Sequence, residues 1–310
     1  MQLNGNYDVD DVVLEALSRL NAPVWRRERA TEGYDYIIVD EMHLFNINEQ
    51  SVFHFLTKDV QKKNIPICFA LDYSQAVGDR GERKHDYTEH AFGKLTEKKY
   101  QTVFRNSPQI TAFCAAIAAS GTLMFEESFI DPYRDIQYSF TLDEERKFEK
   151  PKLFMYRNDA CMIDSIASHI DAITKALHCK PKDIAIVSFD QRILSPEGLD
   201  ELERRTKKKM RRMDQNQFDD SSVPVASPYE INGLEFQAVI IVGADEGRVP
   251  QTAGTSDISQ NFIRYSAYNM LYLVTSRAKY QLVLLGSELN GQSSCLKHSI
   301  QAEYLEVIKV

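Results

Sequence analysis

The chain has 310 residues, of which 43% are hydrophobic and 26% are charged, a composition typical of a soluble globular protein with about two domains. Its formal net charge of -8 excludes a protein that coats nucleic acid through overall positive charge, so any contact with DNA requires a local basic patch. The five cysteines form no Cys-x-x-Cys pair, which favours reduced thiols over a disulfide framework or a zinc site. No apolar stretch suits a signal peptide or the ~20 residues of a membrane span, so we expect a cytoplasmic protein without a membrane partner.

Strand-like and helix-like segments alternate along the chain. Short apolar runs predict buried strands, and longer runs with helical spacing predict helices. In chain order we expect strands at 37–39 and 65–71, a helix at 110–119, a strand at 153–156, a helix at 161–177, and strands at 184–189, 238–242 and 282–285. Such alternation predicts parallel α/β sheets that bind ligands at the carboxyl ends of their strands. A polar, lysine-bearing stretch at 95–102 predicts domains at 1–100 and 101–310.

Two acidic residues, Asp40 and Glu41, directly follow the first predicted strand. A carboxylate in this position can hold Mg²⁺ through water, and its neighbour can orient or deprotonate an attacking water. Because acidic residues also end many ordinary strands, this pair alone has a purely structural alternative.

Two further segments offer side chains for phosphate. Gln75 and Arg80 follow the second predicted strand, and Arg105 precedes the alanine-rich helix. A glutamine at a strand end can position water or sense a γ-phosphate, and an arginine can reach a phosphate oxygen. The alternatives are a polar loop, and a surface charge beside a helix that Asn106 or Ser107 caps.

The last two segments are longer and more specific. The first contains Gly233-Leu234-Glu235-Phe236 and, after a strand, Gly243 to Pro250; the second runs from Leu271 to Lys279 and includes Arg277. Taken in order, all five segments resemble the later ATPase motifs of superfamily 1 DNA helicases of the UvrD/Rep family. The helix-like stretch at 8–20 resembles the helix that precedes the Walker B strand of that family.

The resemblance implies roles for individual residues. Asp40 would hold Mg²⁺, and Glu41 would act as the base for the attacking water. Gln75, Arg105 and Arg277 would contact the γ-phosphate of ATP, where arginines neutralise the charge that develops in the transition state. The segment with Gly233 and Glu235 would bind the nucleotide, with the glutamate at its sugar. The candidates for DNA contacts in the matching segments are Arg80, Ser227 and Tyr229.

The sequence also departs from the family pattern. A phosphate-binding loop requires Gly-x-x-x-x-Gly-Lys-Ser/Thr, whereas the single Gly-Lys pair, Gly93-Lys94, is followed by Leu95. Asp79 stands where the family has a base-stacking aromatic residue, and Tyr229 and Asn232 replace a histidine and a lysine. These changes affect DNA coupling more than nucleotide sensing.

A basic run extends from Arg204 to Arg212, on a stretch that we expect to be helical. It includes Lys207, Lys208 and Arg211, which can line the phosphates of a DNA strand. A solvated helix face, neutralised by Glu201 and Glu203 nearby, is an equally good interpretation.

We therefore predict an α/β protein with RecA-like parallel sheets flanked by helices, one incomplete (1–100) and one complete (101–310). The leading hypothesis is a subunit or fragment of a UvrD-like, ATP- and Mg²⁺-dependent helicase or translocase on single-stranded or partly duplex DNA. Its Walker A loop would come from a partner protein or be lost, so the chain alone should not hydrolyse ATP. The alternative is a non-catalytic, degenerate helicase module that binds a protein partner or DNA.

Overall fold

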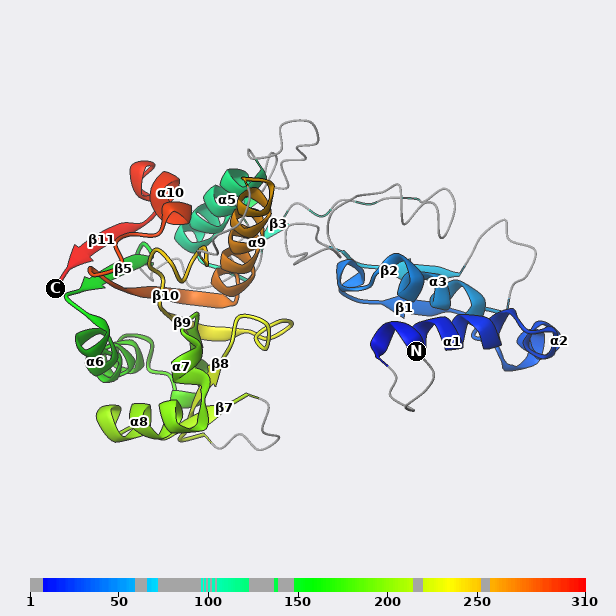
Figure 1. Ribbon diagram of the computed structural model, residues 1–310, viewed down its shortest axis with the longest axis horizontal. Coiled ribbons are helices and arrows are strands. Elements are labelled where there is room, and N and C mark those ends of the chain that lie inside the picture. Colours follow the sequence, from blue (N-terminus) through cyan, green and yellow to red (C-terminus); the bar gives the residue numbers. More distant parts are fainter. Residues whose placement is uncertain are drawn as a thin grey trace. The chain divides into compact units, whose positions relative to one another are not determined.

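The computed structural model describes residues 8–58, 66–71, 96, 98, 100, 102–103, 105–122, 137–138, 148–213, 220–251 and 257–310. The chain divides into two compact units, 1–99 and 100–310 (Figure 1). Among the described residues, no helix combines the length and the apolar character that crossing a membrane requires.

In its described residues, the first unit contains a two-stranded parallel sheet and three α-helices. Its elements are α1 (Val9–Asn21), α2 (Pro23–Glu32), β1 (Ile37–Val39), η1 (Met42–Leu44), α3 (Ile47–Leu56) and β2 (Ile67–Phe69). The carboxylate of Asp8 caps α1, and Asn46 caps α3 in a capping box with Glu49, as short polar side chains do at helix starts. Strands β1 and β2 run parallel, with Ile38 opposite Cys68.

The described part of this sheet consists of the two strands β1 and β2. Val39 and Met42 are buried and pack against apolar residues that include Phe53 of α3 and Phe69 of β2. On the other side of β1, Ile38 is 77% exposed. Parallel sheets in proteins are normally covered on both faces, so this exposure is unusual for a parallel strand. That the first domain is an incomplete RecA-like one stays a prediction.

The second unit contains a seven-stranded, fully parallel sheet in the order β11-β5-β10-β9-β6-β8-β7. The strands are β5 (Lys152–Tyr156), β6 (Ile184–Ser188), β7 (Met210–Arg212), β8 (Val223–Ala226), β9 (Phe236–Val242), β10 (Ala278–Ser287) and β11 (Glu306–Lys309); a separate short pair joins β3 (Thr102–Val103) to β4 (Gln137–Tyr138). The prediction of an α/β fold with a parallel sheet is confirmed.

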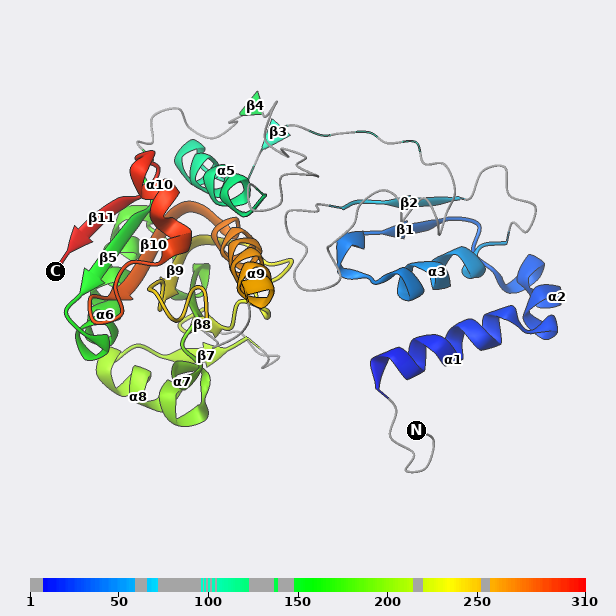
Figure 2. The same cartoon turned by 45° about the horizontal axis from the view of Figure 1, so that its top comes forward.

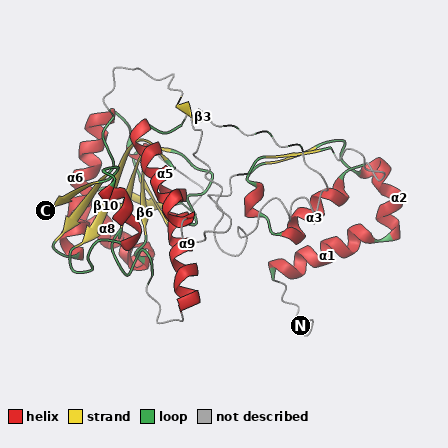
Figure 3. Cartoon of the chain, turned by 90° about the horizontal axis from the view of Figure 1, so that it is seen from above, coloured by secondary structure: helices red, strands yellow, loops and turns green. Residues whose placement is uncertain are grey.

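Helices cover both faces of this sheet (Figure 2). Helix α6 (Asp159–Leu177) lies on one face, and α5 (Pro108–Thr122) and α9 (Asp257–Thr275) lie together on the other (Figure 3). The remaining helices are α7 (Gln191–Leu194), α8 (Pro196–Thr206) and α10 (Lys297–Gln301), with the short 3-10 turns η5 (Pro181–Asp183) and η6 (Ser294–Leu296). Two-sided coverage explains why the central strands are continuous apolar runs.

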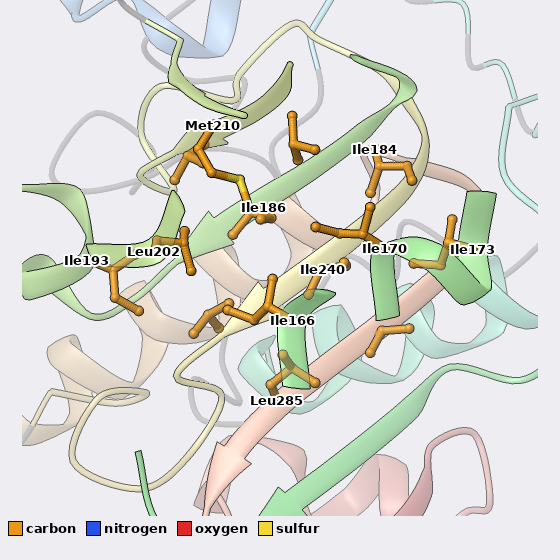
Figure 4. Close-up of a cluster of buried hydrophobic side chains, with 14 of the residues drawn as sticks. Ile166, Ile170, Ile173, Ile184, Ile186, Ile193, Leu202, Met210, Ile240 and Leu285 are labelled. Atoms are coloured by element: carbon orange, nitrogen blue, oxygen red, sulfur yellow. The ribbon is translucent and has the colours of Figure 1, made fainter. Parts of the chain in front are cut away.

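The core on the α6 face follows the helical repeat of that helix. Ile166, Ile170 and Ile173 recur every three to four residues and are almost fully buried. They pack onto alternate strand residues such as Ile186 and Ile240 (Figure 4). Alternation in the strands and helical spacing in α6 thus place one layer of isoleucines between helix and sheet.

The basic run does not form one helix, so that prediction was wrong. Helix α8 ends at Thr206, and Lys207 adopts a left-handed conformation with φ 55° at its end. Residues 210–212 instead form the edge strand β7. Pairing with β8 outweighs the helical preference of the lysines and arginines, because tertiary contacts override weak intrinsic propensities.

Candidate functional site

The loop after β1 presents Asp40 to solvent. Asp40 is exposed, and its Oδ1 accepts a hydrogen bond of 2.9 Å from the backbone N–H of Glu41. The loop is tied to β2, because Ala70 donates to the carbonyl of Val39 at 2.9 Å and accepts from the N–H of Met42 at 2.8 Å. The small sheet therefore fixes where the Asp40 carboxylate emerges.

Glu41 has an unusual backbone. Its φ of 53° and ψ of 42° are left-handed, a conformation that costs a residue with a side chain roughly 1–2 kcal/mol. Non-glycine residues are held in such conformations mainly where the geometry serves a function. The left-handed turn at Glu41 redirects the chain from β1 into η1, which begins at the next residue.

The carboxylate of Asp40 is suited to Mg²⁺ that a nucleotide brings with it. Magnesium usually keeps several waters and takes one or two protein carboxylates together with phosphate oxygens. No group of three or more metal-ligating side chains occurs among the described residues, so within that part of the chain there is no all-protein metal cage. A single exposed carboxylate at the end of a strand fits the shared kind of site.

In the second unit, Glu235 connects two cationic side chains. Its Oε1 lies 2.6 Å from Nε of Arg105, and its Oε2 lies 2.8 Å from Nζ of Lys279. Each of the three side chains is partly exposed, between 32% and 40%. Parallel pairing of β9 with β10, in which Phe236 lies opposite Ala278, brings Glu235 beside Lys279. Arg105 reaches them from the segment before α5.

Arg277 lies beneath this cluster, in the interior of the second unit. Its residue is 1% exposed, its Nε donates to the carbonyl of Leu273 at 3.0 Å, and its own carbonyl accepts from the N–H of Phe236 at 3.0 Å. The arginine that the resemblance implies as a γ-phosphate contact is thus in the interior of the second unit. Of the three cations, Arg105 and Lys279 are the ones that solvent can reach.

The electrostatics of the cluster favour an anion. Partial burial by itself raises the pKa of Glu235, but the hydrogen bond from Lys279 and the charges of Arg105, Lys279 and Arg277 outweigh it, so the pKa lies below its usual value. Three cations around one carboxylate leave positive charge in excess. Fixed guanidinium and ammonium groups of this kind are suited to phosphate oxygens.

Two residues of this site were not assigned roles from the sequence. In the sequence, Lys279 is part of the motif that contains Arg277, and Asn106 is a candidate helix cap. In the structure, the side-chain amide of Asn106 donates to the carbonyls of Ser276 and Ala278 at 2.8 and 2.7 Å. The motif itself was a signal for Lys279, whereas nothing in the local sequence indicates the contacts of Asn106.

The cluster lies at the amino end of the sheet, contrary to the expectation of ligands at the carboxyl ends. Glu235 directly precedes β9, and Arg277 directly precedes β10. At the carboxyl ends of the strands, charged side chains of the protein pair with one another. There Arg248 lies 2.5 Å from Asp159, 3.1 Å from Asp190 and 2.7 Å from Asp245, so a guanidinium takes the place where a ligand was expected.

In this network at the carboxyl ends of the strands, the side chains of Arg248, Asp190 and Asp245 are largely buried. Arg192 adds contacts of 2.5 Å to Asp190 and 2.8 Å to Asp159. Burial raises the pKa values of these two carboxyl groups, but the hydrogen bonds and charges of the arginines lower them more, so both pKa values lie below normal. Gly243, with φ 82°, permits this packing, because a Cβ there would lie 2.8 Å from Cδ of Arg248.

Two of the residues predicted to contact DNA, Ser227 and Tyr229, lie directly after β8. Tyr229 is 67% exposed in the turn after β8, so a base can reach its ring. The N–H of Ser227 donates at 2.6 Å to Glu230, whose carboxylate is 2.5 Å from Arg212. The left-handed Gly233, with φ 74°, then turns the chain toward Glu235.

The basic run is partly neutralised by neighbouring acids. Arg204 pairs with Glu201, Arg205 pairs with Asp164, and Lys208 pairs with Asp171 of α6. Lys207 is exposed at the end of α8, and Arg211 is half-buried in β7. The structural interpretation of this run gains weight from these pairs. Gln75 and Arg80 lie outside the described residues.

Comparisons with solved structures give distant similarities, one of which is described here. No protein-family model matches the sequence, and no curated protein matches it. The chain is similar to the crystal structure of the C-terminal domain of a possible DNA helicase from Lactobacillus plantarum WCFS1, with 17% identity and a TM-score of 0.44, over 66% of this chain and 98% of that one. A similarity of this size does not establish a function, so the function must be inferred from the residues of this chain.

Proposed function

We propose that the chain is a subunit or fragment of a UvrD-like ATP-dependent DNA helicase or translocase, with the phosphate-binding loop supplied by another polypeptide. The observation that carries this proposal is the cluster of Arg105, Glu235 and Lys279 beside Arg277. Four residues from three sequence segments, in the order of the helicase motifs, meet in the second unit. A chance resemblance of separate surface loops would not bring them together.

In this proposal the cluster around Glu235 binds the phosphates of ATP, and Asp40 and Glu41 have the roles that the helicase resemblance implies for them. Mg²⁺ held by Asp40 and the phosphate oxygens would neutralise charge on the transferred group. Glu41 would orient the water, and Arg105 would stabilise the charge that develops on the γ-phosphate. Since Arg105 and Lys279 now pair with Glu235, a phosphate must compete with that carboxylate. The ATP phosphates would thus replace a contact that the protein already makes.

A second function is favoured by a specific observation. Arg277 is buried, and several cations of the basic run are already paired with acids. A degenerate module that no longer hydrolyses ATP would keep such a fold while binding DNA or a protein partner. The two functions differ in whether the cluster around Glu235 binds a triphosphate.

Titration of Mg²⁺·ATP into the full chain, followed by calorimetry, tests the proposal. We expect weak, saturable binding that the double variant Arg105→Ala/Lys279→Ala abolishes. The matched control is Arg204→Ala/Lys208→Ala. It also removes two cations, but these lie on or just after α8 and pair with acids other than Glu235, so binding should be unchanged. Absence of binding by the unaltered chain, or equal loss in both double variants, would favour the degenerate module.

A further inference from the structure

Asn106 makes two hydrogen bonds that bracket Arg277. Its residue is 8% exposed, and its Nδ2 donates to the carbonyl of Ser276 at 2.8 Å and to that of Ala278 at 2.7 Å. Because both partners are carbonyl oxygens, the group between them must be the amide NH₂, and its two hydrogens serve one carbonyl each. The acceptors are 170 and 172 residues away in the sequence.

The neighbouring backbone extends this connection. The N–H of Ser107 donates to the carbonyl of Lys279 at 2.8 Å, and the N–H of Phe236 donates to the carbonyl of Arg277 at 3.0 Å. The segment that carries Arg105 is thereby fixed to the segment that carries the other two cations. That second segment is in turn fixed to the start of β9, directly after Glu235. Among these hydrogen bonds, only the two from Asn106 are made by a side chain.

We infer that Asn106 is a positioning residue, which sets the spacing of Arg105, Arg277 and Lys279 around Glu235 and thereby the affinity of this cluster for phosphate. The part that concerns affinity rests on the proposed function. Asn106 is adjacent to one cation in sequence, and its two acceptors lie on either side of another. A small shift of this contact would therefore move the cations relative to each other, and a geometry error of about 1 Å is costly in a site that aligns phosphates.

The chemistry of the amide predicts a graded series of variants. Asn106→Ser keeps at most one donor, Asn106→Ala keeps none, and Asn106→Asp places a carboxylate against two carbonyl oxygens. Leaving buried carbonyls without donors is unfavourable, so every variant should also lower stability. Loss of stability alone does not distinguish positioning from a purely structural role.

The pKa of Glu235 provides a measurement that does distinguish them, and it requires no nucleotide. That pKa is held low by the three cations, so it reports their distances from the carboxylate. NMR titration of the carboxyl carbons in the full chain should show the pKa of Glu235 rising toward its ordinary value in Asn106→Ala, and by less in Asn106→Ser. Mg²⁺·ATP affinity should fall about tenfold in Asn106→Ala, as for one lost charge-assisted contact.

Asn158→Ala is the matched control. Asn158 caps α6 by accepting from the N–H of Cys161 at 2.9 Å, after the carboxyl end of β5, so it is remote from Glu235. This variant should lose stability, typically by about 1 kcal/mol, without changing the pKa of Glu235 or ATP affinity.

The outcomes separate the inference from the proposed function. If Asn106→Ala and Asn158→Ala both lower stability and neither changes the pKa of Glu235, the positioning role is overturned. If the unaltered chain binds no ATP while the pKa of Glu235 still responds to Asn106, the proposed function fails and the positioning role stands. Should Asn106→Ala not fold, Asn106→Ser gives the same decision, because an unchanged pKa of Glu235 in that variant overturns the inference.

Discussion

The carboxylate of Glu235 lies 2.6 Å from the guanidinium of Arg105, although the two residues come from motifs far apart in the sequence. Lys279 binds the other oxygen of the same carboxylate. Glu235 therefore both organises the cations of the second unit and competes with any phosphate that they bind. This double role leads to predictions on anion binding and on pH.

Glu235→Gln should strengthen the binding of inorganic triphosphate. The substitution removes the negative charge that pairs with Arg105 and Lys279 and keeps the shape of the side chain, so both cations become available to the anion. We expect a several-fold gain in affinity that diminishes with added salt, because partly exposed charges are screened. Calorimetric titration checks this, with Glu201→Gln in α8 as the control that should change nothing. Weaker binding in Glu235→Gln would show that the carboxylate serves only to hold the cations in place.

The contribution of Glu235 to stability should depend on pH. Its pKa is lower in the folded protein than in the unfolded chain, so the stability that it contributes is present above its unfolded pKa of about 4.3. This stability is lost as the pH falls through the lower, folded value. Urea unfolding of the unaltered chain and of Glu235→Gln should therefore differ most near neutral pH and converge in acid. A difference that stays constant between neutral pH and pH 3 would contradict this.

Arg248 should matter far more for stability than Arg192, although both bind Asp190. The side chain of Arg248 is 13% exposed and binds the fully buried Asp245, whereas that of Arg192 is 72% exposed. Removing one partner of a buried pair leaves an uncompensated charge and costs about 3 kcal/mol or more, while an exposed pair contributes at most ~1 kcal/mol. Denaturant unfolding of Arg248→Ala and Arg192→Ala compares them, and equal effects would show that the network is not the buried support described here.

Glu41→Gly should be more stable than Glu41→Ala. Both variants lack the carboxylate, but only glycine adopts a φ of 53° without strain, so the glycine variant should be favoured by about 1 kcal/mol. The fluorescence of the single tryptophan, Trp25, follows unfolding of the first unit, since its indole donates to the carbonyl of Phe55 at 2.9 Å. A more stable alanine variant would indicate that the left-handed turn is absent in solution.

Much of the central sheet could be predicted from the sequence, and its edges could not. β5, β6, β9 and β10 are continuous apolar runs because both of their faces are covered. β8 contains Pro224, which lacks a ladder donor, and β7 contains Arg211 and Arg212, so neither resembles a buried strand. Their place in the sheet depends on contacts with neighbouring strands.

In the candidate site, too, some features could be predicted from the sequence and others could not. Arg105, Glu235 and Arg277 are singled out by the sequence because their segments resemble helicase motifs, and the structure brings Arg105 and Glu235 into contact; their roles in binding stay a prediction. The burial of Arg277 and the two hydrogen bonds of Asn106 could not be predicted, since they depend on how α5 and α9 pack against β10. No local pattern in the sequence carries that information.

Steady-state ATP hydrolysis in the presence of single-stranded DNA tests the central claim most directly. The purified chain should show no hydrolysis, because its sequence contains no Gly-x-x-x-x-Gly-Lys-Ser/Thr loop to hold the β- and γ-phosphates in line for attack. Mixing it with a polypeptide that carries Gly-x-x-x-x-Gly-Lys-Ser/Thr, encoded beside it, should restore hydrolysis, and Arg105→Ala should then reduce the rate about 10³-fold or more. Hydrolysis by the chain alone that Glu41→Gln abolishes, or no hydrolysis with such a partner, would contradict the account.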